Sequence, residues 1–574
     1  MTTHHIGLAF DLIGDLFPDG TSKEVASYLN RKGPLPFGAI VREVNLSAVN
    51  IARSIATLAM HDLIECSSDN RSDSKRVLYA FSLQRALYIL HYAKCIHCAR
   101  QLYGFDGELI IEELLLNGKQ RMSTLLIKVY ERLIKAGKDP TVHSLQSIKE
   151  TFKSLVSAHF LQRILIDESK PHIPITIEET STNLVQIPEL TPEGWKYLIS
   201  NQQEESNEPA AKKIKVPTPT FGDEKIFWKV NFQRFFAHLR DQELIHAFTS
   251  RIDSNAGEIV RTMLRLAEIK PNPERTISIS FIDIAKTISA AGLQLTDETL
   301  QKYMNVITSD VIAKTISAAG LQLTDETLQK YMNVITSDVN NCIIKIGDQG
   351  RGTYEVDFQK ALSGLTKAHI QSFLRERYGS NALRIYNMLE ERGCLSQKQI
   401  EDMAMINAKE AQQYVYSMFI DGMLTLEELS KANDFNPTRT FYFFRVNLYN
   451  GVLSLLDHSY KTMSNLMQRH QFEKERHRKL IDKRDKVEAI IHSLREQNAD
   501  DEQIKEVEDI LSPIEKEQIQ KLDAAFRKIE LAQLQLTETI LLLEMFLSIS
   551  KSVAPAQKKT GGRAVAAKLL ETRS

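Results

Sequence analysis

The sequence has little of several things, and each shortage excludes a class of protein. Cysteine is scarce, with five residues in 574, which is too few for a disulfide scaffold and typical of a reducing compartment. No run of 18 apolar residues occurs, because the most apolar stretch, Ile540–Ile549, is short and carries Glu544. The N-terminal residues lack the basic and apolar regions of a signal peptide. We therefore expect a soluble, intracellular protein that does not span a membrane.

An excess of positive charge is also missing. The chain holds 72 Lys and Arg against 73 Asp and Glu, which gives a net charge of −1. A chain of this charge has no global positive field that would draw it onto nucleic acid. Any contact with DNA must come from local patches or from a larger assembly. The remaining composition, 43% hydrophobic and 25% charged, is ordinary for a globular protein of several domains.

A helix followed by a β-hairpin is predicted near the N-terminus. Apolar residues between Asn45 and Leu63 lie mostly at helical spacing. Leu63–Cys66 then has the pattern of a strand, and after a polar loop Arg76–Phe81 has the pattern of a second strand. This order is typical of a winged helix-turn-helix, in which the last helix and the hairpin, called the wing, flank one small core.

The same order recurs three more times along the chain, and four spaced copies are more informative than one. Each copy consists of a helix and two strands separated by a polar or Gly-rich loop. The copies are Ile148–His159 with Phe160–Leu165 and Asn183–Ile187; Leu328–Val334 with Cys342–Ile346 and Tyr354–Val356; and Ala408–Phe419 with Gly422–Leu426 and Thr440–Phe444.

After Val446 the strand patterns stop and two helical stripes begin. Leu480, Val487 and Leu494 fall seven residues apart in a charged sequence. The second stripe starts at Ser512, which has the position of an N-cap with Glu515 closing a capping box. The polar segment between the two stripes offers a reversal point. These patterns predict a long antiparallel helical hairpin.

The predicted fold class is mainly α with small β-hairpins (α+β): four tandem winged-helix units followed by an antiparallel coiled-coil hairpin. Two polar segments that carry basic residues are expected to be disordered. The predicted boundaries are 1–83 (winged helix 1), 84–200 (winged helix 2), 201–224 (basic linker), 225–364 (winged helix 3), 365–446 (winged helix 4), 447–550 (coiled coil) and 551–574 (basic tail).

Within the third predicted unit, residues 284–311 reappear unchanged as residues 312–339. Structural repeats keep core positions and drift elsewhere, so full identity over 28 residues indicates a recent duplication of nucleotide sequence. A duplicated or merged exon, or an error in the gene model, is the favoured explanation over a genuine extra helical pair. Since one copy suffices for the place before the hairpin at Cys342, the other is expected to pack poorly and to carry no function.

Motifs for catalysis, cofactors or metals are not found. Cys95 and Cys98 form a C-x-x-C pair, but zinc needs four ligands and no second pair has suitable spacing. The pair lies in a predicted helix, where core cysteines are the simpler interpretation. The glycines at 347–352 lack the Lys-Ser/Thr ending of a phosphate-binding loop and suit a wing tip. We expect no catalytic residue, no metal, no cofactor and no small-molecule substrate.

Two sets of basic residues are candidates for function. Arg53, Lys75 and Arg76 lie on the first recognition helix and wing, where a winged helix would contact DNA phosphates. The alternative, favoured by the neutral net charge, is that these units dock on protein. Lys212, Lys213 and Lys215 lie in the predicted linker and form either a nuclear localisation signal or a solvated charge cluster.

Several stretches of the chain resemble a known family. Gly107–Gly118, Gly257–Arg265, Phe227–Phe235, Pro437–Tyr442 and Val487–Ile491 are similar to the largest subunit of the heterotrimer specific to RNA polymerase III, a family related to the alpha subunit of TFIIE. The resemblance extends over about residues 5–549, apart from the duplication. It does not extend into the tail after Ser550.

The resemblance implies a non-catalytic nuclear subunit with winged-helix units and a coiled coil. It implies two smaller partner subunits, docking on the clamp of the polymerase core, and contact with promoter DNA inside the complex. The expected role is promoter binding and DNA opening at genes for transfer RNA, 5S ribosomal RNA and other small RNAs. A free-standing winged-helix DNA-binding regulator is the alternative, and an enzyme or a scaffold with a single winged helix fits the pattern less well.

Overall fold

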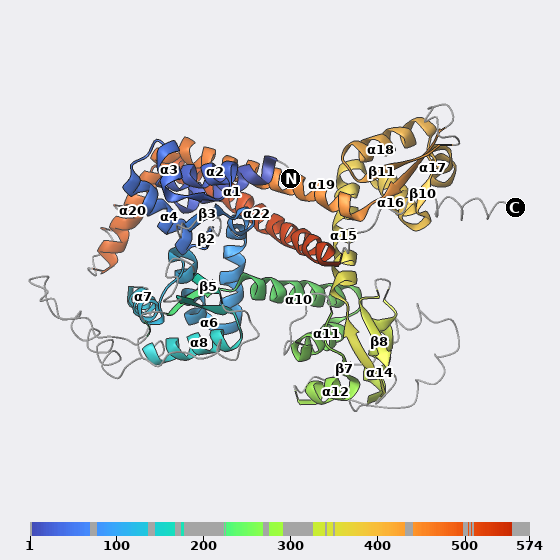
Figure 1. Ribbon diagram of the computed structural model, residues 1–574, viewed down its shortest axis with the longest axis horizontal. Coiled ribbons are helices and arrows are strands. Elements are labelled where there is room, and N and C mark those ends of the chain that lie inside the picture. The colour runs from blue at the N-terminus through green and yellow to red at the C-terminus, as the bar shows by residue number, and fades with distance from the viewer. Residues whose placement is uncertain are drawn as a thin grey trace, which may run out of the picture. The chain divides into compact units, whose positions relative to one another are not determined.

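The structure is a computed structural model in which two compact units are distinguished. The N-terminal unit comprises Met1–His238 and Met463–Arg469, and the C-terminal unit comprises Leu239–Thr462 and His470–Ser574. Figure 1 labels the helices and strands of both units. The residues described are 3–68, 77–135, 144–166, 174–176, 223, 226–267, 275–290, 325–338, 341–347, 351–430, 440–496, 503, 507 and 510–553.

Four antiparallel sheets of three strands each lie among the helices. The strand orders are β1-β3-β2, β5-β4-β6, β7-β9-β8 and β10-β12-β11. In three of the four, the last strand of the hairpin lies in the middle, so that it pairs both with the other hairpin strand and with a short strand from earlier in the chain. The prediction of a mainly helical chain with small β-hairpins is confirmed.

The hairpin of the first sheet follows helix α4, which has one buried and one exposed face as its sequence predicts. Ser47 caps α4 by accepting a hydrogen bond from the Asn50 amide at 3.2 Å. Ile51, Ile55 and Leu58 are buried on its inner face. The elements are α1 (Thr3–Leu16), α2 (Thr21–Lys32), β1 (Leu35–Pro36), α3 (Phe37–Glu43), α4 (Ala48–Met60), β2 (Ile64–Ser68) and β3 (Val77–Phe81).

The second sheet follows after a run of helices and is centred on one buried tryptophan. Trp228 is fully buried and meets Phe152 edge to face, with ring centroids 5.3 Å apart. Gly104 interrupts α6 with a φ of 72°. The elements are α5 (Leu83–Leu87), η1 (Tyr88–His91), α6 (Tyr92–Asn117), α7 (Met122–Lys135), α8 (Leu145–Ser157), β4 (Leu161–Ile166), β5 (Pro174–Thr176) and β6 (Ile226–Val230).

The pairing of this sheet differs from the predicted pairing. β4 pairs with β6, in the register Leu161 to Val230, whereas the predicted partner Asn183–Ile187 lies outside the described residues. β6 therefore belongs to the second sheet and not to the third predicted unit, which was expected to begin at residue 225. The predicted pairing was wrong because β4 and β6 are separated by a long, largely polar stretch. Asn183–Ile187 is an apolar run nearer to β4 in sequence and is therefore the partner that the local pattern predicts. The stretch 201–224 lies between two strands of one sheet.

Asp223 holds the end of that stretch against the second sheet's helices. Its carboxylate is 1% exposed and accepts hydrogen bonds from the Ser123 amide at 2.8 Å and from the Ser123 hydroxyl at 3.1 Å. Ser123 lies in the first turn of α7, where unpaired amides favour a negative charge. Asp223 thus completes the start of a helix that lies 100 residues earlier in the chain.

Two helices beside the third sheet contain residues from the two copies of the duplicated sequence. Helix α12 begins before the first copy and continues into it, while α14 comes from the second copy. Tyr331 of α14 is 1% exposed and donates a hydrogen bond to Asp253 at 2.9 Å. The place directly before the hairpin at Cys342 is thus filled by α14 from one copy, as expected, and α12 takes residues from the other. Residues 291–311 lie outside the described residues, so the expectation that the remaining copy packs poorly stays a prediction. The elements are α10 (Phe232–Arg251), α11 (Ser254–Ala267), β7 (Ile279–Ser280), α12 (Phe281–Ala290), α14 (Asp325–Thr336), β8 (Ile343–Gly347) and β9 (Thr353–Val356).

The fourth sheet matches its predicted helix and hairpin closely. Helix α17 begins with a capping box formed by Ser396 and Gln399. β11 and β12 pair in an unbroken register from Leu424–Val446 to Ser430–Thr440. The elements are α15 (Phe358–Tyr378), α16 (Ser380–Arg392), β10 (Cys394–Leu395), α17 (Gln397–Ala404), α18 (Ala408–Ile420), β11 (Leu424–Ser430) and β12 (Thr440–Val446).

The last three helices are α19 (Leu448–Arg476), α20 (Arg478–Glu496) and α22 (Pro513–Val553), and α20 and α22 form the predicted antiparallel hairpin. The capping box at its second helix is present, since the Ser512 amide donates to Glu515 at 2.9 Å. Among the described residues, α22 is long and apolar enough to cross a membrane by length and composition. However, α22 packs on α15, and its Glu544 accepts a hydrogen bond from Tyr460, so this helix is part of a protein core.

Candidate functional site

The predicted DNA-contact residues are only partly described. Arg53 lies on the exposed face of α4, whereas Lys75 and Arg76 lie outside the described residues, as do Lys212, Lys213 and Lys215. The structure therefore places one of the three predicted DNA contacts on the surface and does not test whether the three come together.

The exposed face of α4 carries little charge. Val49 is 68% exposed and Met60 is 39% exposed, and Ala52 and Ala56 also face solvent beside Arg53. A recognition helix that reads a DNA groove needs several polar or cationic side chains that reach base edges and phosphates. This face offers one cation among small aliphatic groups, which suits contact with another protein.

The corresponding helix of the fourth sheet, α18, is more apolar still. Tyr416 and Ile420 are each 63% exposed and Phe419 is 39% exposed, and Met405 in the preceding turn is 89% exposed. Exposed apolar groups that share one helix face mark interaction sites more often than free surface. We call Met405, Tyr416, Phe419 and Ile420 the α18 face.

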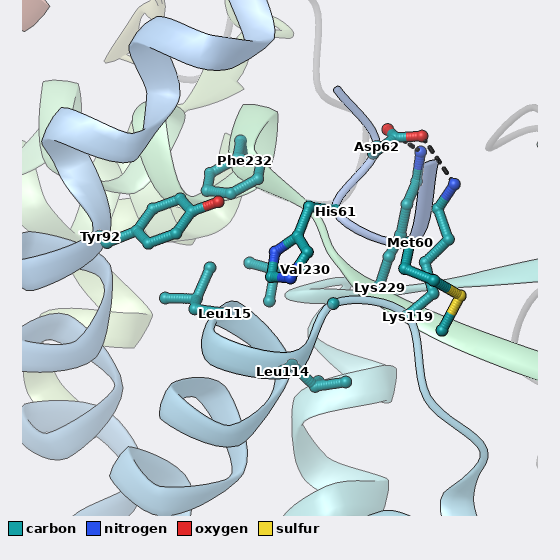
Figure 2. A pocket seen from close by; sticks show the side chains of 11 residues that line it. Met60, His61, Asp62, Tyr92, Leu114, Leu115, Lys119, Lys229, Val230 and Phe232 are labelled. Atoms are coloured by element: carbon teal, nitrogen blue, oxygen red, sulfur yellow. Dashed lines mark hydrogen bonds and ion pairs between the residues drawn. The ribbon is translucent and has the colours of Figure 1, made fainter. Parts of the chain in front are cut away.

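A pocket at the end of α4 is lined by charged residues that meet at one carboxylate. Figure 2 shows Asp62 with Lys119 and Lys229 converging on it. The Lys119 ammonium lies 2.9 Å from one carboxylate oxygen, and the Lys229 ammonium lies 3.1 Å from the other. Arg85 adds a third cation at 3.4 Å and also contacts Glu65 at 3.1 Å.

These residues come from different elements and fix the first sheet to the second. Asp62 follows α4, Lys119 follows α6, and Lys229 lies in β6. The backbone joins at the same place, since the Lys119 amide donates to the Met60 carbonyl at 2.9 Å. Gly118 makes this approach possible: its φ is 75°, and a Cβ atom here would lie 2.5 Å from the Met60 oxygen. We call this region the Asp62 joint.

Three cations share one carboxylate at this half-buried joint. Burial alone would raise the pKa of Asp62, but the charges of Lys119, Lys229 and Arg85 outweigh it and hold that pKa below its usual value. Burial, with the repulsion of Lys119 and Arg85, lowers the pKa of Lys229 against the attraction of Asp62. One carboxylate is thus shared among three cations, and each is engaged within the protein.

His61 completes the joint on its apolar side. Figure 2 shows its ring beside Val230 and Leu115, apart from the Asp62 ion pairs. The ring also meets Phe17 edge to face at 4.9 Å between centroids. Burial and the nearby Lys119 lower the pKa of His61 to about 4, so the ring is neutral at physiological pH. Because Asp62, Lys119 and Lys229 are engaged with one another, we interpret the pocket as a structural contact between the first and second sheets.

The two paired cysteines lie in the core, as their helical spacing predicts. Cys95 and Cys98 are 0% and 2% exposed in α6. Burial raises the pKa of Cys95 far above its ordinary value and that of Cys98 to about 11. Both are therefore thiols, which bind metals poorly. In the part of the chain that the structure describes, no group of three or more His, Cys, Asp or Glu is placed to hold a metal ion.

No sequence pattern indicates the Asp62 joint. Asp62, Lys119 and Lys229 are far apart in the chain and belong to no motif. The apolar α18 face could have been found, because Tyr416, Phe419 and Ile420 lie at helical spacing beside a second apolar stripe that forms the core.

Comparison with protein-family models gives three matches in different parts of the chain. The model of RNA polymerase III subunit RPC82 matches residues 150–365. The model of the C-terminal winged-helix domain of POLR3C matches residues 370–446, which contain the fourth sheet. The model of the helical hairpin domain of DNA-directed RNA polymerase III subunit RPC3 matches residues 479–542, within α20 and α22.

Similar proteins align with the chain over nearly its whole length. DNA-directed RNA polymerase III subunit RPC3 of Bos taurus is 31% identical over 560 residues, which is 95% of this chain and 99% of the relative. The protein of the same name from Rattus norvegicus is 32% identical over 563 residues, and that from Homo sapiens is 31% identical over 561 residues, with the same coverage.

Proposed function

Since this chain belongs to the RPC3 (RPC82) family of non-catalytic RNA polymerase III subunits, we propose that it helps this polymerase to bind and open its promoters. In this role the chain joins two smaller polymerase III-specific subunits in a heterotrimer that docks on the clamp of the core enzyme. The complex then initiates transcription of transfer RNA, 5S ribosomal RNA and other small RNA genes. Membership of the family implies association with the polymerase and with the nuclear transcription machinery.

The proposal includes a fold of four winged-helix units. The fourth sheet lies in the region matched by a winged-helix model. The first and third sheets share its strand order, with the last strand in the middle, and the same succession of helices before the hairpin. The second sheet differs in that β4 lies between β5 and β6. The nuclear localisation signal at Lys212, Lys213 and Lys215 stays a prediction.

The observation that carries the proposal is the low charge of the helix faces that would otherwise read DNA. The α18 face is apolar, and the exposed face of α4 holds one arginine. A free-standing regulator would present cations there, because phosphate neutralisation supplies most of the affinity for DNA. Faces of this kind are suited to docking on protein, and DNA affinity then comes from the assembled polymerase.

The first test is to purify the tagged chain from nuclear extract at moderate salt and to identify the recovered proteins by mass spectrometry. We expect the large polymerase III subunits and two small partners in near-equal amounts. Recovery of the chain alone, with tight and salt-sensitive binding of promoter DNA, would instead support the free-standing regulator.

A second test maps the docking face. Replacing Tyr416 and Ile420 by alanine removes exposed apolar surface from α18, whereas replacing Gln412 and Gln413 by alanine alters the same helix without that loss. We expect the first pair to reduce recovery of the polymerase several-fold at unchanged thermal stability, and the second pair to leave recovery intact. Equal recovery with both pairs would exclude the α18 face as a docking surface.

A further inference from the structure

A group of exposed cations lies at the break between α19 and α20, in the C-terminal unit. Lys474 and Arg476 end α19, Arg478 and Lys479 begin α20, and His477 separates the two helices, which Figure 1 labels in turn. All four cations are exposed, and the side chain of Arg478 is 81% exposed. We call these four residues the basic junction.

Two cations near the junction have acidic partners, whereas Lys486 and Lys528 are among those of the described hairpin that have none. Lys483 lies 2.7 Å from Glu515, and Arg484 lies 3.1 Å from Asp523 across the two helices. Within the described residues, by contrast, Lys474, Arg476 and Lys479 form no ion pair or hydrogen bond through their side chains. Arg478 has one partner, Asp482, at 3.9 Å, the outer limit of an ion pair. The surplus charge of the junction is therefore not used within the hairpin.

Helix stability explains only two of the four cations of the junction. Lys474 and Arg476 lie in the last turn of α19, where cations favour the helix dipole. Arg478 and Lys479 lie in the first turn of α20, where cations oppose it, and that turn contains no acidic residue. A sequence that breaks a local rule without compensation in the fold points to a function at that place.

We infer that the basic junction contacts the phosphate backbone of DNA within the polymerase complex. The inference rests on the proposed function and names the residues of its DNA contact. A patch of exposed, unpaired Lys and Arg complements a polyanion, and the arginine fork can bind phosphate through two hydrogen bonds. The contact would lie on the helical hairpin and would supplement the recognition-helix contact predicted for Arg53.

An acidic protein segment is the other polyanion that could bind here, and the composition of the junction argues against it. Stable protein interfaces depend on apolar or aromatic anchors at their centre. Residues 474–479 contain no apolar side chain, and the nearest large exposed one in sequence is Phe472, at 53% exposure, one turn before Arg476.

The test compares two fourfold variants in the assembled polymerase. The first replaces Lys474, Arg476, Arg478 and Lys479 by glutamine. The matched control replaces four exposed cations that lie outside the junction, so that the net charge changes equally; they are Lys398, Lys409, Lys461 and Lys528. Binding of a promoter fragment with a premelted segment is measured by fluorescence anisotropy over a range of salt concentrations, and subunit content is measured on the same samples.

We expect the junction variant to assemble normally and to bind DNA about 10-fold more weakly than the control at physiological salt. The slope of log affinity against log salt should fall by about 3.6, because each of the four lost phosphate contacts removes ~0.9 from it. Affinity and slope equal to those of the control would overturn the inference. Loss of one of the smaller subunits, with DNA binding otherwise unchanged, would overturn it in favour of an acidic protein segment.

Failure of the proposed function has a different signature. The wild-type chain would then not be recovered with the polymerase at all. In that case the same salt titration with the isolated full-length chain decides the inference, since the junction and its control differ only in the position of the cations removed.

Discussion

The Asp62 joint and the basic junction contain the same kinds of residue in opposite circumstances. In the joint, Lys119, Lys229 and Arg85 converge on one carboxylate within 3.4 Å. In the junction, four cations in six residues face solvent, and the nearest carboxylate partner is at 3.9 Å. The joint uses its cations to hold two sheets together, whereas the junction leaves them available.

This difference shows why counts of charged residues say little about function. Both regions contribute to the total of 72 basic residues, and the net charge of −1 reveals neither of them. What separates them is burial and the presence of acidic partners. A half-buried ion cluster is costly to break because its charges have left water, while exposed charges cost little to remove.

The largest expected effect comes from Gly118, where the backbone of the joint approaches Met60. Gly118→Ala places a Cβ atom 2.5 Å from the Met60 oxygen and imposes a φ of 75°. We expect a loss of about 4 kcal/mol in the stability of the N-terminal unit, about half from backbone strain and half from the clash. Hydrogen exchange of Leu63–Ser68 and Ile226–Val230 would measure the loss.

Gly379 provides the matched control, because its φ of 88° is similar while nothing lies within 4 Å of a Cβ atom there. Gly379→Ala should cost only the strain, about 2 kcal/mol. Equal losses at the two positions would mean that the close approach at Gly118 contributes nothing to the joint.

Removal of the central carboxylate should come next in size. Asp62→Ala leaves the half-buried Lys119 and Lys229 without their anion, and we expect a loss of about 3 kcal/mol, visible as a lower melting temperature of the N-terminal unit. The equivalent change at the junction, Asp482→Ala, removes the carboxylate beside Arg478 and should change stability by less than about 0.5 kcal/mol. Similar losses of stability in Asp62→Ala and Asp482→Ala would mean that the Asp62 joint and the basic junction do not differ in how much their carboxylates stabilise the fold.

A smaller, pH-dependent effect is expected from His61. Its pKa is about 4 in the folded protein, below the ordinary 6.5, so the unfolded chain binds a proton over this interval and the folded chain does not. The stability that His61 contributes is complete above pH 6.5 and is lost as the pH falls towards 4. Between pH 7 and pH 5.5 we expect a loss of about 1 kcal/mol in thermal unfolding of the N-terminal unit.

His61→Gln should remove this difference between the two pH values, because glutamine does not titrate. His477→Gln at the junction is the control and should leave the difference intact. The pKa of Asp62 lies below its usual value, so this carboxylate stays charged throughout the interval and does not contribute to the change. A pH dependence that persists in His61→Gln would contradict the assignment.

The smallest effect is expected at the junction itself. Arg478→Gln removes a cation from the first turn of α20, and we expect stability to stay the same or to rise by a few tenths of a kcal/mol, measured by thermal unfolding. A clear loss of stability would mean that Arg478 is kept for the fold, and it would weaken the argument that the junction is kept for binding.

Much of the fold could be predicted because its signals are local. The capping box at Ser512 and Glu515, the hairpin after α18 and the heptad spacing of α20 all depend on residues close together in sequence. The pairing of β4 with β6 could not, since it joins strands separated by a long polar segment. Local patterns report which elements form and say little about distant partners.

The candidate sites show the same limit. Arg53 was found from its place on a recognition helix, and its exposure is as expected. The Asp62 joint was missed, because three residues with no shared motif meet only after two sheets have packed. The basic junction lies at the start of a stretch that the sequence shows only as charged, and the structure adds that its four cations are exposed and gather at the break between two helices.

The origin of α12 and α14 in different copies of the repeat has a consequence for the gene. Helix α12 takes its end from the first copy of the 28-residue repeat, and α14 comes from the second copy. Because the copies are identical, unequal recombination that removes either one produces the same shorter protein, and that protein still encodes both helices in order. A protein with one copy should therefore form the same α12 and α14 as the protein with two.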